Sequence, residues 1–159
     1  MKKQRFKMSK ELYHKLTKSE RIGYKLIGLK AQIEELRSHL LPSGIAYDKE
    51  NVQSSPDDKI AKVVMEIEEL QEEYSALQLK QADAIKETRE FINKLSDPKQ
   101  IVIMELSYIA HLNHKEIADE IKYSREWVTS KYHEAIEILD RILKNTEYTE
   151  NTKNTEYTE

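Results

Sequence analysis

The sequence predicts an all-α protein in which a long antiparallel helical hairpin or coiled-coil arm precedes a small helix-turn-helix head. Only three glycines and three prolines occur in 159 residues, so few positions favour turns. Apolar residues recur every three or four positions over two long stretches, as in a coiled-coil seam. We expect an arm over residues 1–96, a helix-turn-helix domain over residues 97–143 and a disordered tail, which repeats NTEYTE, over residues 144–159.

Composition restricts the class of protein. The chain contains no cysteine, which excludes disulfides and thiolate metal sites and is typical of a cytoplasmic protein. No apolar run approaches the roughly 20 residues of a membrane span. The N-terminus also lacks the apolar core of a signal peptide. We therefore expect a cytoplasmic protein with no membrane partner.

The first long helix is predicted from about Ser9 to Leu41. Its seam alternates spacings of four and three, at Ile22, Leu26, Leu29, Ile33, Leu36 and Leu40. Gly23 and Gly28 weaken the helix by about 1 kcal/mol each relative to alanine, and they could mark the close approach of another helix. The basic residues before it, MKKQRFK, are either a frayed terminus or an arm that contacts DNA.

A second long helix is predicted from Pro56 to about Leu95, after a loop over residues 42–55. Its seam alternates spacings of three and four, at Ile60, Val63, Ile67, Leu70, Tyr74, Leu77, Gln81, Ala84, Thr88, Phe91 and Leu95. The stretch from Gln81 to Thr88 is a poor seam. It either fixes the register and oligomer number of a coiled coil or packs elsewhere.

The arm can close in two ways. The first helix folds back on the second, or the arm pairs between two chains. Because the second helix is longer than the first, part of its seam would lack a partner within the chain. We therefore expect a homodimer whose contacts include the better half of this seam, Ile60, Val63, Ile67, Leu70, Tyr74 and Leu77.

A mostly apolar helix is predicted after the break at Ser96, where Asp97 is a suitable cap and Pro98 suits the first helical position. Its apolar residues lie nearly all round, which is typical of a buried helix: Ile101, Val102, Met104, Leu106, Ile109 and Leu112. We expect this helix to support the two helices that follow.

The stretch from Asn113 to Leu143 predicts two helices joined by a tight turn. Asn113 can cap the first, with Glu116 completing a capping box, and Ser124 can cap the second. The buried stripe of the second helix is Val128, Tyr132, Ala135, Ile136, Leu139 and Leu143. Its other side carries mainly polar residues: Arg125, Glu126, Thr129, Ser130 and His133. In helix-turn-helix proteins, this second helix enters the major groove of DNA.

The segment from about Leu95 to Leu143 resembles region four of bacterial sigma factors. KEIADEI is similar to the scaffold helix of that family, and SREWV is similar to the start of its promoter-reading helix. The resemblance implies that Arg125 and Glu126 read bases of the upstream promoter element. With the hairpin before it, the segment also resembles small phage regulators of late transcription of the ArpU and RinA type, which implies a phage-encoded protein.

Two positions depart from the sigma-factor pattern. Lys122 occupies the turn position where glycine is common, and a positive φ is costly for a residue with a side chain. We therefore expect a turn that is opened or shaped differently. Lys131 stands where the family has an apolar residue, and Tyr132 replaces it in the stripe, which indicates a slightly rotated reading helix.

Charge is unevenly distributed along the chain. Residues 1–41 hold 11 Lys or Arg and 4 Asp or Glu, a net charge of +7. Residues 97–143 hold 6 and 9, a net charge of −3. Because phosphate contacts need Lys and Arg, the basic N-terminal helix either supplies contacts beside the reading helix or is a solvated face.

The sequence contains no motif for catalysis or cofactor binding, such as a Gly-rich phosphate loop, HExxH or GxSxG. We expect no enzyme, no cofactor and no metal, since His111 and His114 lack a third ligand at a suitable spacing. Trp127 either packs beneath the start of the reading helix or is an exposed anchor for a thymine methyl or a protein partner.

The residues favour a sequence-specific transcription regulator that binds double-stranded DNA as a homodimer and activates or modulates promoters. Arg125 would bond guanine edges and Glu126 would accept from cytosine. The other expected DNA contacts are Thr129, Ser130, Lys131, His133, Lys115 and Lys122. One alternative is a protein-interaction module that binds host RNA polymerase or another host protein. The other is the small subunit of a phage DNA-packaging machine.

Overall fold

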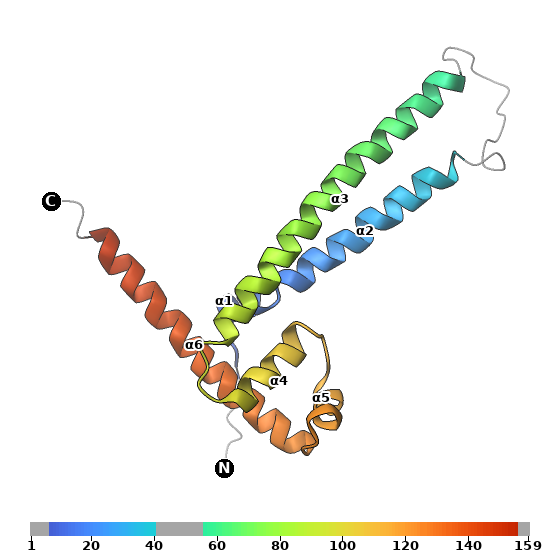
Figure 1. Cartoon of the computed structure of the whole chain (residues 1–159). Coiled ribbons are helices and arrows are strands. Elements are labelled where there is room, and N and C mark those ends of the chain that lie inside the picture. The colour runs from blue at the N-terminus through green and yellow to red at the C-terminus, as the bar shows by residue number, and fades with distance from the viewer. Residues whose placement is uncertain (1–6, 41–55, 156–159) are drawn as a thin grey trace. The chain divides into compact units, whose positions relative to one another are not determined.

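A computed structural model describes residues 7–40 and 56–155, and this part of the chain is all-helical (Figure 1). The helices are α1 (Lys10–Leu16), α2 (Lys18–Ser38), α3 (Pro56–Ile92), α4 (Pro98–Tyr108), α5 (His114–Ile121) and α6 (Arg125–Thr155). The predicted fold class is therefore confirmed as all-α. The loop expected at residues 42–55 and the first six residues of the basic arm lie outside the described residues.

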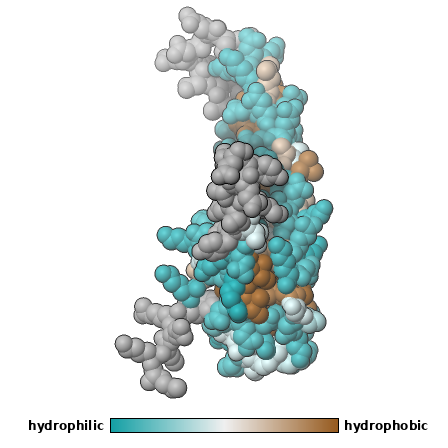
Figure 2. Space-filling model, turned by 90° about the vertical axis from the view of Figure 1, so that its left-hand side faces the viewer, coloured by the Kyte–Doolittle hydropathy of each residue, from teal (hydrophilic) through white to brown (hydrophobic). Residues whose placement is uncertain are grey.

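A helix that crosses a bilayer needs about 20 mostly apolar residues. Within the described ranges, none of the helices combines the length and the apolar character needed to cross a membrane. Hydrophilic side chains cover most of the face shown in Figure 2, with a smaller hydrophobic patch among them. This distribution agrees with the 35% of charged residues in the chain.

The helices divide between two compact units. The larger unit contains the described residues up to Ser19 and those from Ala84 onward, and the hairpin unit runs from Glu20 to Asp83. The division therefore falls inside α2 and α3 rather than at residue 96, where the sequence indicates a break. As a result, α3 contributes its first part to one core and its last part to another.

In the hairpin unit, α2 and α3 run side by side in opposite directions (Figure 1). Ile33 near the end of α2 shares a groove with Tyr74, whereas Gly23 near its start lies beside Gln81. A Cβ at Gly23 would lie 3.0 Å from Gln81 Nε2, so this glycine permits the close approach expected of it. The predicted seam residues of α2 are all buried or half-buried: Ile22, Leu26, Leu29, Ile33, Leu36 and Leu40. The seam thus closes within one chain.

Part of the α3 seam expected to lack a partner within the chain is buried, whereas the first seam residue, Ile60, is 43% exposed. Ala84, Thr88 and Phe91 are all buried in the larger unit. Ala84 and Thr88 therefore pack elsewhere, one of the two predicted alternatives for the poor seam, whereas Gln81 stays beside Gly23 of α2. The argument for a homodimer from helix length is consequently weaker, because the last part of α3 joins another core within the chain.

The prediction of a single helix from Ser9 to Leu41 is wrong. The chain forms two helices in this range, and Thr17 separates them. The amide and the hydroxyl of Thr17 both donate to the Tyr13 carbonyl, at 3.0 and 2.7 Å. Side-chain bonds of this kind compete with regular helix geometry. The break lets Leu12 and Leu16 turn into the core of the larger unit, where both are fully buried.

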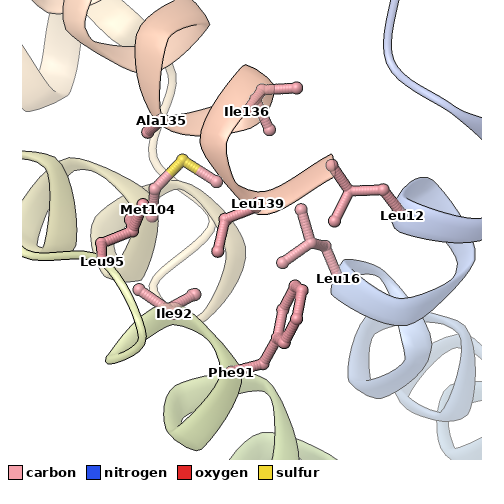
Figure 3. Close-up of a cluster of buried hydrophobic side chains, with 9 residues drawn as sticks. All are labelled: Leu12, Leu16, Phe91, Ile92, Leu95, Met104, Ala135, Ile136 and Leu139. Carbon is pink, nitrogen blue, oxygen red and sulfur yellow. The ribbon is translucent and has the colours of Figure 1, made fainter. Parts of the chain in front are cut away.

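The core of the larger unit combines residues that lie far apart in the sequence (Figure 3). Its buried side chains come from α1, from the end of α3 and the turn that follows it, from α4 and from α6: Leu12, Leu16, Phe91, Ile92, Leu95, Met104, Ala135, Ile136 and Leu139. Polar contacts reinforce the packing of α1, since the Ser9 hydroxyl donates to Asp140 on α6. Thus α1 is part of the body that carries the helix-turn-helix elements, although the sequence groups it with the arm.

The tail expected to be disordered from residue 144 continues α6 as a helix to Thr155, and residues 156–159 lie outside the described residues. Threonine hydroxyls in this part bond back into the helix. Thr146 Oγ1 donates to the Ile142 carbonyl at 2.8 Å, and Thr149 Oγ1 contacts the Thr146 carbonyl at 2.8 Å. The physical reason is cooperativity: once the packed half of α6 is formed, each added residue gains a backbone hydrogen bond without new nucleation.

Candidate nucleic-acid interface

The supporting helix, α4, begins as predicted. Asp97 caps it, and its carboxylate accepts the Lys99 amide at 2.9 Å. Ile103 and Met104 are fully buried, but Val102 is 41% exposed. The expectation that α4 is buried nearly all round is therefore wrong, because only one side packs against neighbouring helices.

The capping box at the start of α5 is present as predicted. The Asn113 side chain accepts the amides of Lys115 and Glu116 at 3.0 and 3.1 Å, and Glu116 Oε2 accepts the Asn113 amide at 2.7 Å. Ile117 and Ala118 then pack with Ile103 and Val128 in a small core beneath the turn. This core holds α5 against α4 and α6.

The turn after α5 is closed, so the expectation of a turn that is opened or shaped differently is wrong. Lys122 adopts the left-handed conformation itself, with φ 61° and ψ 41°. Its amide and that of Tyr123 both donate to the Ala118 carbonyl. The Lys122 side chain is exposed, so it meets no steric obstacle, and the two hydrogen bonds satisfy the helix end as a glycine turn would.

Helix α6, which the sequence predicts to be the reading helix, starts at its predicted cap. Ser124 Oγ accepts the Trp127 amide at 3.2 Å, and the Ser124 carbonyl accepts the Val128 amide at 3.0 Å. Each residue of the predicted stripe is buried or half-buried: Val128, Tyr132, Ala135, Ile136, Leu139 and Leu143. The helix is therefore oriented with its polar side outward.

Five of the predicted DNA contacts come together on this polar side. They line one open hollow of about 510 Å³: Arg125, Glu126, Thr129, Ser130 and His133. Arg125, Glu126 and Ser130 are exposed, and the other two are half-buried. A guanidinium, a carboxylate, two hydroxyls and an imidazole can together donate to and accept from the edges of base pairs.

One residue of the hollow is held by a partner that the sequence does not reveal. His114 Nδ1 lies 2.9 Å from Thr129 Oγ1, and the His114 ring centroid lies 4.7 Å from that of Tyr132. Burial lowers the pKa of His114, and the nearby His133 and Arg125 lower the pKa further. Nothing in the spacing of the sequence links His114 to Thr129, because the tertiary fold creates their contact.

The structure also bears on metal binding. Among the described residues, no three His, Asp or Glu side chains are grouped in a way that could hold a metal ion. The imidazole of His114 is instead engaged with Thr129, on the side that faces α6.

The three predicted lysine contacts do not line the hollow. Lys131 Nζ lies 2.7 Å from Glu134 Oε2, and this hydrogen bond is the main reason that the pKa of Lys131 is raised. Lys115 and Lys122 are exposed on α5 and in the turn. These lysines therefore lie outside the five-residue hollow.

Trp127 packs beside the helix start rather than standing free. It contacts the small core beneath the turn and stacks on Tyr123, with ring centroids 4.0 Å apart and an interplanar angle of 17°. Lys99 Nζ lies 5.2 Å from the Tyr123 ring centroid and 5.6 Å from that of Trp127. The first of the two interpretations of Trp127 is therefore confirmed.

The basic N-terminal segment is divided between the two units. The lysines of α1 belong to the larger unit, where Lys10 and Lys15 are exposed. Lys18 lies 2.7 Å from Glu87 in an exposed ion pair. Hence part of the positive charge, but not all of it, belongs to the same body as the reading helix.

Comparison with known proteins places the chain in a family. A family model described as "Protein of unknown function (DUF1492)" matches residues 43–140. The chain belongs to this family. No curated protein and no solved structure matches the chain. The match includes all of α3, α4 and α5 and the first half of α6. Since the family description gives no activity, the function has to be argued from the geometry of the site.

Proposed function

We propose that this member of the DUF1492 family is a non-enzymatic, sequence-specific regulator of transcription that binds double-stranded DNA through the start of α6. The observation that carries the proposal is the open hollow lined by five polar side chains of this helix. The resemblance to region four of sigma factors and to phage regulators of the ArpU and RinA type supports a phage-encoded protein that acts at promoters.

The support beneath the hollow suits this role. A capped α5, a hydrogen-bonded turn and a capped α6 hold the polar residues on rigid elements. Side chains on such elements lose little additional freedom when they bind, so their hydrogen bonds can discriminate between base pairs. The bond between Thr129 and His114 adds to this rigidity.

Each residue of the hollow has a chemically distinct role in the proposal. Arg125 bonds the O6 and N7 atoms of a guanine, and Glu126 accepts from the amino group of a cytosine. Thr129, Ser130 and His133 contact further base edges or phosphates. Lys115, Lys122 and the exposed lysines of α1 supply contacts to the backbone.

The test begins with selection of fragments from sheared genomic DNA of the source at about 0.1 M salt, where non-specific phosphate binding is already weakened. We expect enrichment of one or a few sites. Arg125→Ala should then weaken binding to the selected site by about 1–3 kcal/mol and relax the preference at one base pair.

Arg141→Ala is the matched control, because it removes an exposed arginine from the same helix, outside the hollow. It should leave binding to the selected site nearly unchanged. Equal binding by the wild type and Arg125→Ala would contradict the role of Arg125, and no enrichment of any site would contradict the proposal as a whole.

A second candidate function is binding of RNA polymerase or another host protein. The observation that favours it is the stack of Tyr123 on Trp127 beneath Lys99, with the exposed Val102 one turn after Lys99 on α4. Aromatic residues with one exposed side are common at the centres of protein interfaces. A pull-down that survives nuclease treatment and is lost in Tyr123→Ala would support this candidate. Loss of every partner after nuclease treatment would count against it.

A further inference from the structure

The outward side of α2 carries a second apolar face, distinct from the seam that packs on α3. Tyr24 and Ile27 are each 66% exposed, and Gly28 and Ala31 beside them are exposed as well. These four residues follow the spacing i, i+3, i+4 and i+7, so they lie along one side of the helix. A helix that packs on one partner within the chain needs only one apolar side, the side that contacts this partner.

The outward side of α3 provides a comparison. On this helix, the exposed Met65 and Leu79 are separated by the exposed acidic residues Glu68, Glu69 and Glu72. Charged residues of this kind are the usual covering of a solvated helix face. The outward side of α2 differs because its exposed apolar residues are adjacent along the helix, with no charged residue between Tyr24 and Ile27 on that side.

No contact within the chain explains why position 28 is a glycine. A Cβ at Gly28 would meet nothing within 4 Å, whereas a Cβ at Gly23 would press on Gln81. Glycine inside a helix is destabilising relative to alanine, so its presence calls for a benefit. On a face that carries Tyr24 and Ile27, the absence of a side chain permits close approach of another backbone.

Charge complementarity indicates which molecule approaches. Arg21 and Glu35 are both exposed, and they lie equally far before and after Gly28 on one side of α2. Glu35 also lies 3.4 Å from His39 in an exposed pair, so a contact between chains would add to or replace this surface interaction. If a second α2 crosses the first in the opposite direction at Gly28, Arg21 of each copy faces Glu35 of the other. A two-fold axis makes such a contact self-complementary, as an interface between identical chains requires.

We propose that the outward face of α2, defined by Tyr24, Ile27, Gly28 and Ala31, is the interface of a homodimer in which two α2 helices cross antiparallel at Gly28. Tyr24 and Ile27 of each copy cover the small residues of the other, and the two Arg21–Glu35 pairs flank them. This face replaces the α3 seam as the dimer contact. This inference goes beyond the proposed function, because contact through this face does not depend on DNA binding.

The test is the oligomeric state of the full chain without DNA, measured by sedimentation over about a hundredfold range of protein concentration. We expect a monomer–dimer equilibrium for the wild type. Ile27→Lys places two like charges at the crossing and should raise the dimer dissociation constant at least about tenfold. Met65→Lys is the matched control, since Met65 is similarly exposed on α3 and should leave the equilibrium unchanged.

Charge reversal gives a second test that does not depend on the apolar residues. Arg21→Glu and Glu35→Arg should each weaken the dimer, and the double variant should restore it because both pairs are re-formed with opposite sign. The circular dichroism of each variant shows whether its helices are intact.

Three outcomes would overturn the proposal. One is a wild type that stays monomeric at every concentration. Another is a dimer that Ile27→Lys leaves intact, and the third is a dimer lost in Leu79→Lys on α3 instead. Because DNA is absent from all of these measurements, a failure of this proposal is distinguishable from a failure of DNA binding.

Discussion

Lys122 takes the backbone conformation that helix-turn-helix proteins often assign to glycine. The left-handed conformation costs roughly 1–2 kcal/mol for a residue with a Cβ. Two amides that share the Ala118 carbonyl offset part of this cost. His111, just before α5, is the other non-glycine residue with a positive φ among the described residues, at 59°. Strain is therefore stored on both sides of α5.

At the same scale, Lys122→Gly should stabilise the protein, because glycine adopts a positive φ without steric cost. We expect the free energy of unfolding to rise by about 0.5–1 kcal/mol. Urea unfolding followed by fluorescence of Trp127, the single tryptophan, would measure the change. Lys122→Ala is the control, since it removes the same charge but keeps the Cβ. Equal stability of these two variants would argue against strain at Lys122.

His114 makes stability depend on pH. Its pKa in the folded protein lies below the ordinary histidine value of 6.5, chiefly because the imidazole is partly buried. The unfolded chain therefore takes up a proton first as the pH falls, and folding stability decreases between 6.5 and the lower folded pKa. Above pH 6.5, His114 makes its full contribution to the free energy of unfolding.

The measurement is the free energy of unfolding of the wild type and of His114→Gln at about pH 7.5 and about pH 5.5. Glutamine can still bond Thr129 but does not titrate in this range. We expect the wild type to lose more stability than the variant on acidification. The same loss in both proteins would mean that His114 is not the titrating group.

Among the elements, α1 shows how a short helix depends on its neighbours. Helices shorter than about 12 residues are marginal in water by themselves, and α1 spans only Lys10–Leu16. Its order comes from two fully buried leucines and from the bonds between Ser9 and Asp140 on α6. Consequently α1 is a structural part of the larger unit rather than an extension of the arm.

Leu12→Ala should therefore destabilise the larger unit by about 2–5 kcal/mol, the usual cost of leaving a cavity in a packed core. Unfolding followed by Trp127 fluorescence reports on this unit, since Trp127 lies within it. Tyr13→Ala is the neighbouring control, because the Tyr13 side chain is 52% exposed. A loss no larger for Leu12→Ala than for Tyr13→Ala would show that α1 is not docked.

Over the whole molecule, burial is unequal between the two units. The buried hydrophobic residues of the hairpin unit are Leu26, Leu29, Ile33 and Ile67, and each keeps slight exposure. In the larger unit, by contrast, many side chains are fully buried, among them Leu16, Ile92, Ile103 and Leu139. Local stability follows the density of buried apolar contacts.

Amide hydrogen exchange should therefore separate the two units. We expect the amides of α2 and of the first half of α3 to exchange faster than those of α4 and of the packed half of α6. Protection should rise along α3 at about Ala84, where the helix passes into the larger unit. Uniform protection along all of α3 would contradict this expectation and indicate a single cooperative body.

The local patterns of the sequence determined much of this protein. Spacing predicts the seam of α2 and the stripe of α6, because burial on a helix follows its 3.6-residue period whatever the partner. Capping predicts the starts of α4, α5 and α6, because Asp97, Asn113 and Ser124 act on amides only a few residues away. The five residues of the hollow follow from these same local rules, since they face away from the stripe.

Only the tertiary structure decided what each apolar face meets. Periodicity does not distinguish a seam that pairs with α2 from one that enters another core. The sequence therefore does not predict which helices Ala84 and Thr88 contact. The turn at Thr17, which sends Leu12 and Leu16 into the larger unit, and the contact of His114 with Thr129 likewise depend on residues distant in sequence. Local rules concern neighbours along the chain, whereas these features depend on packing between segments that only the complete fold brings together.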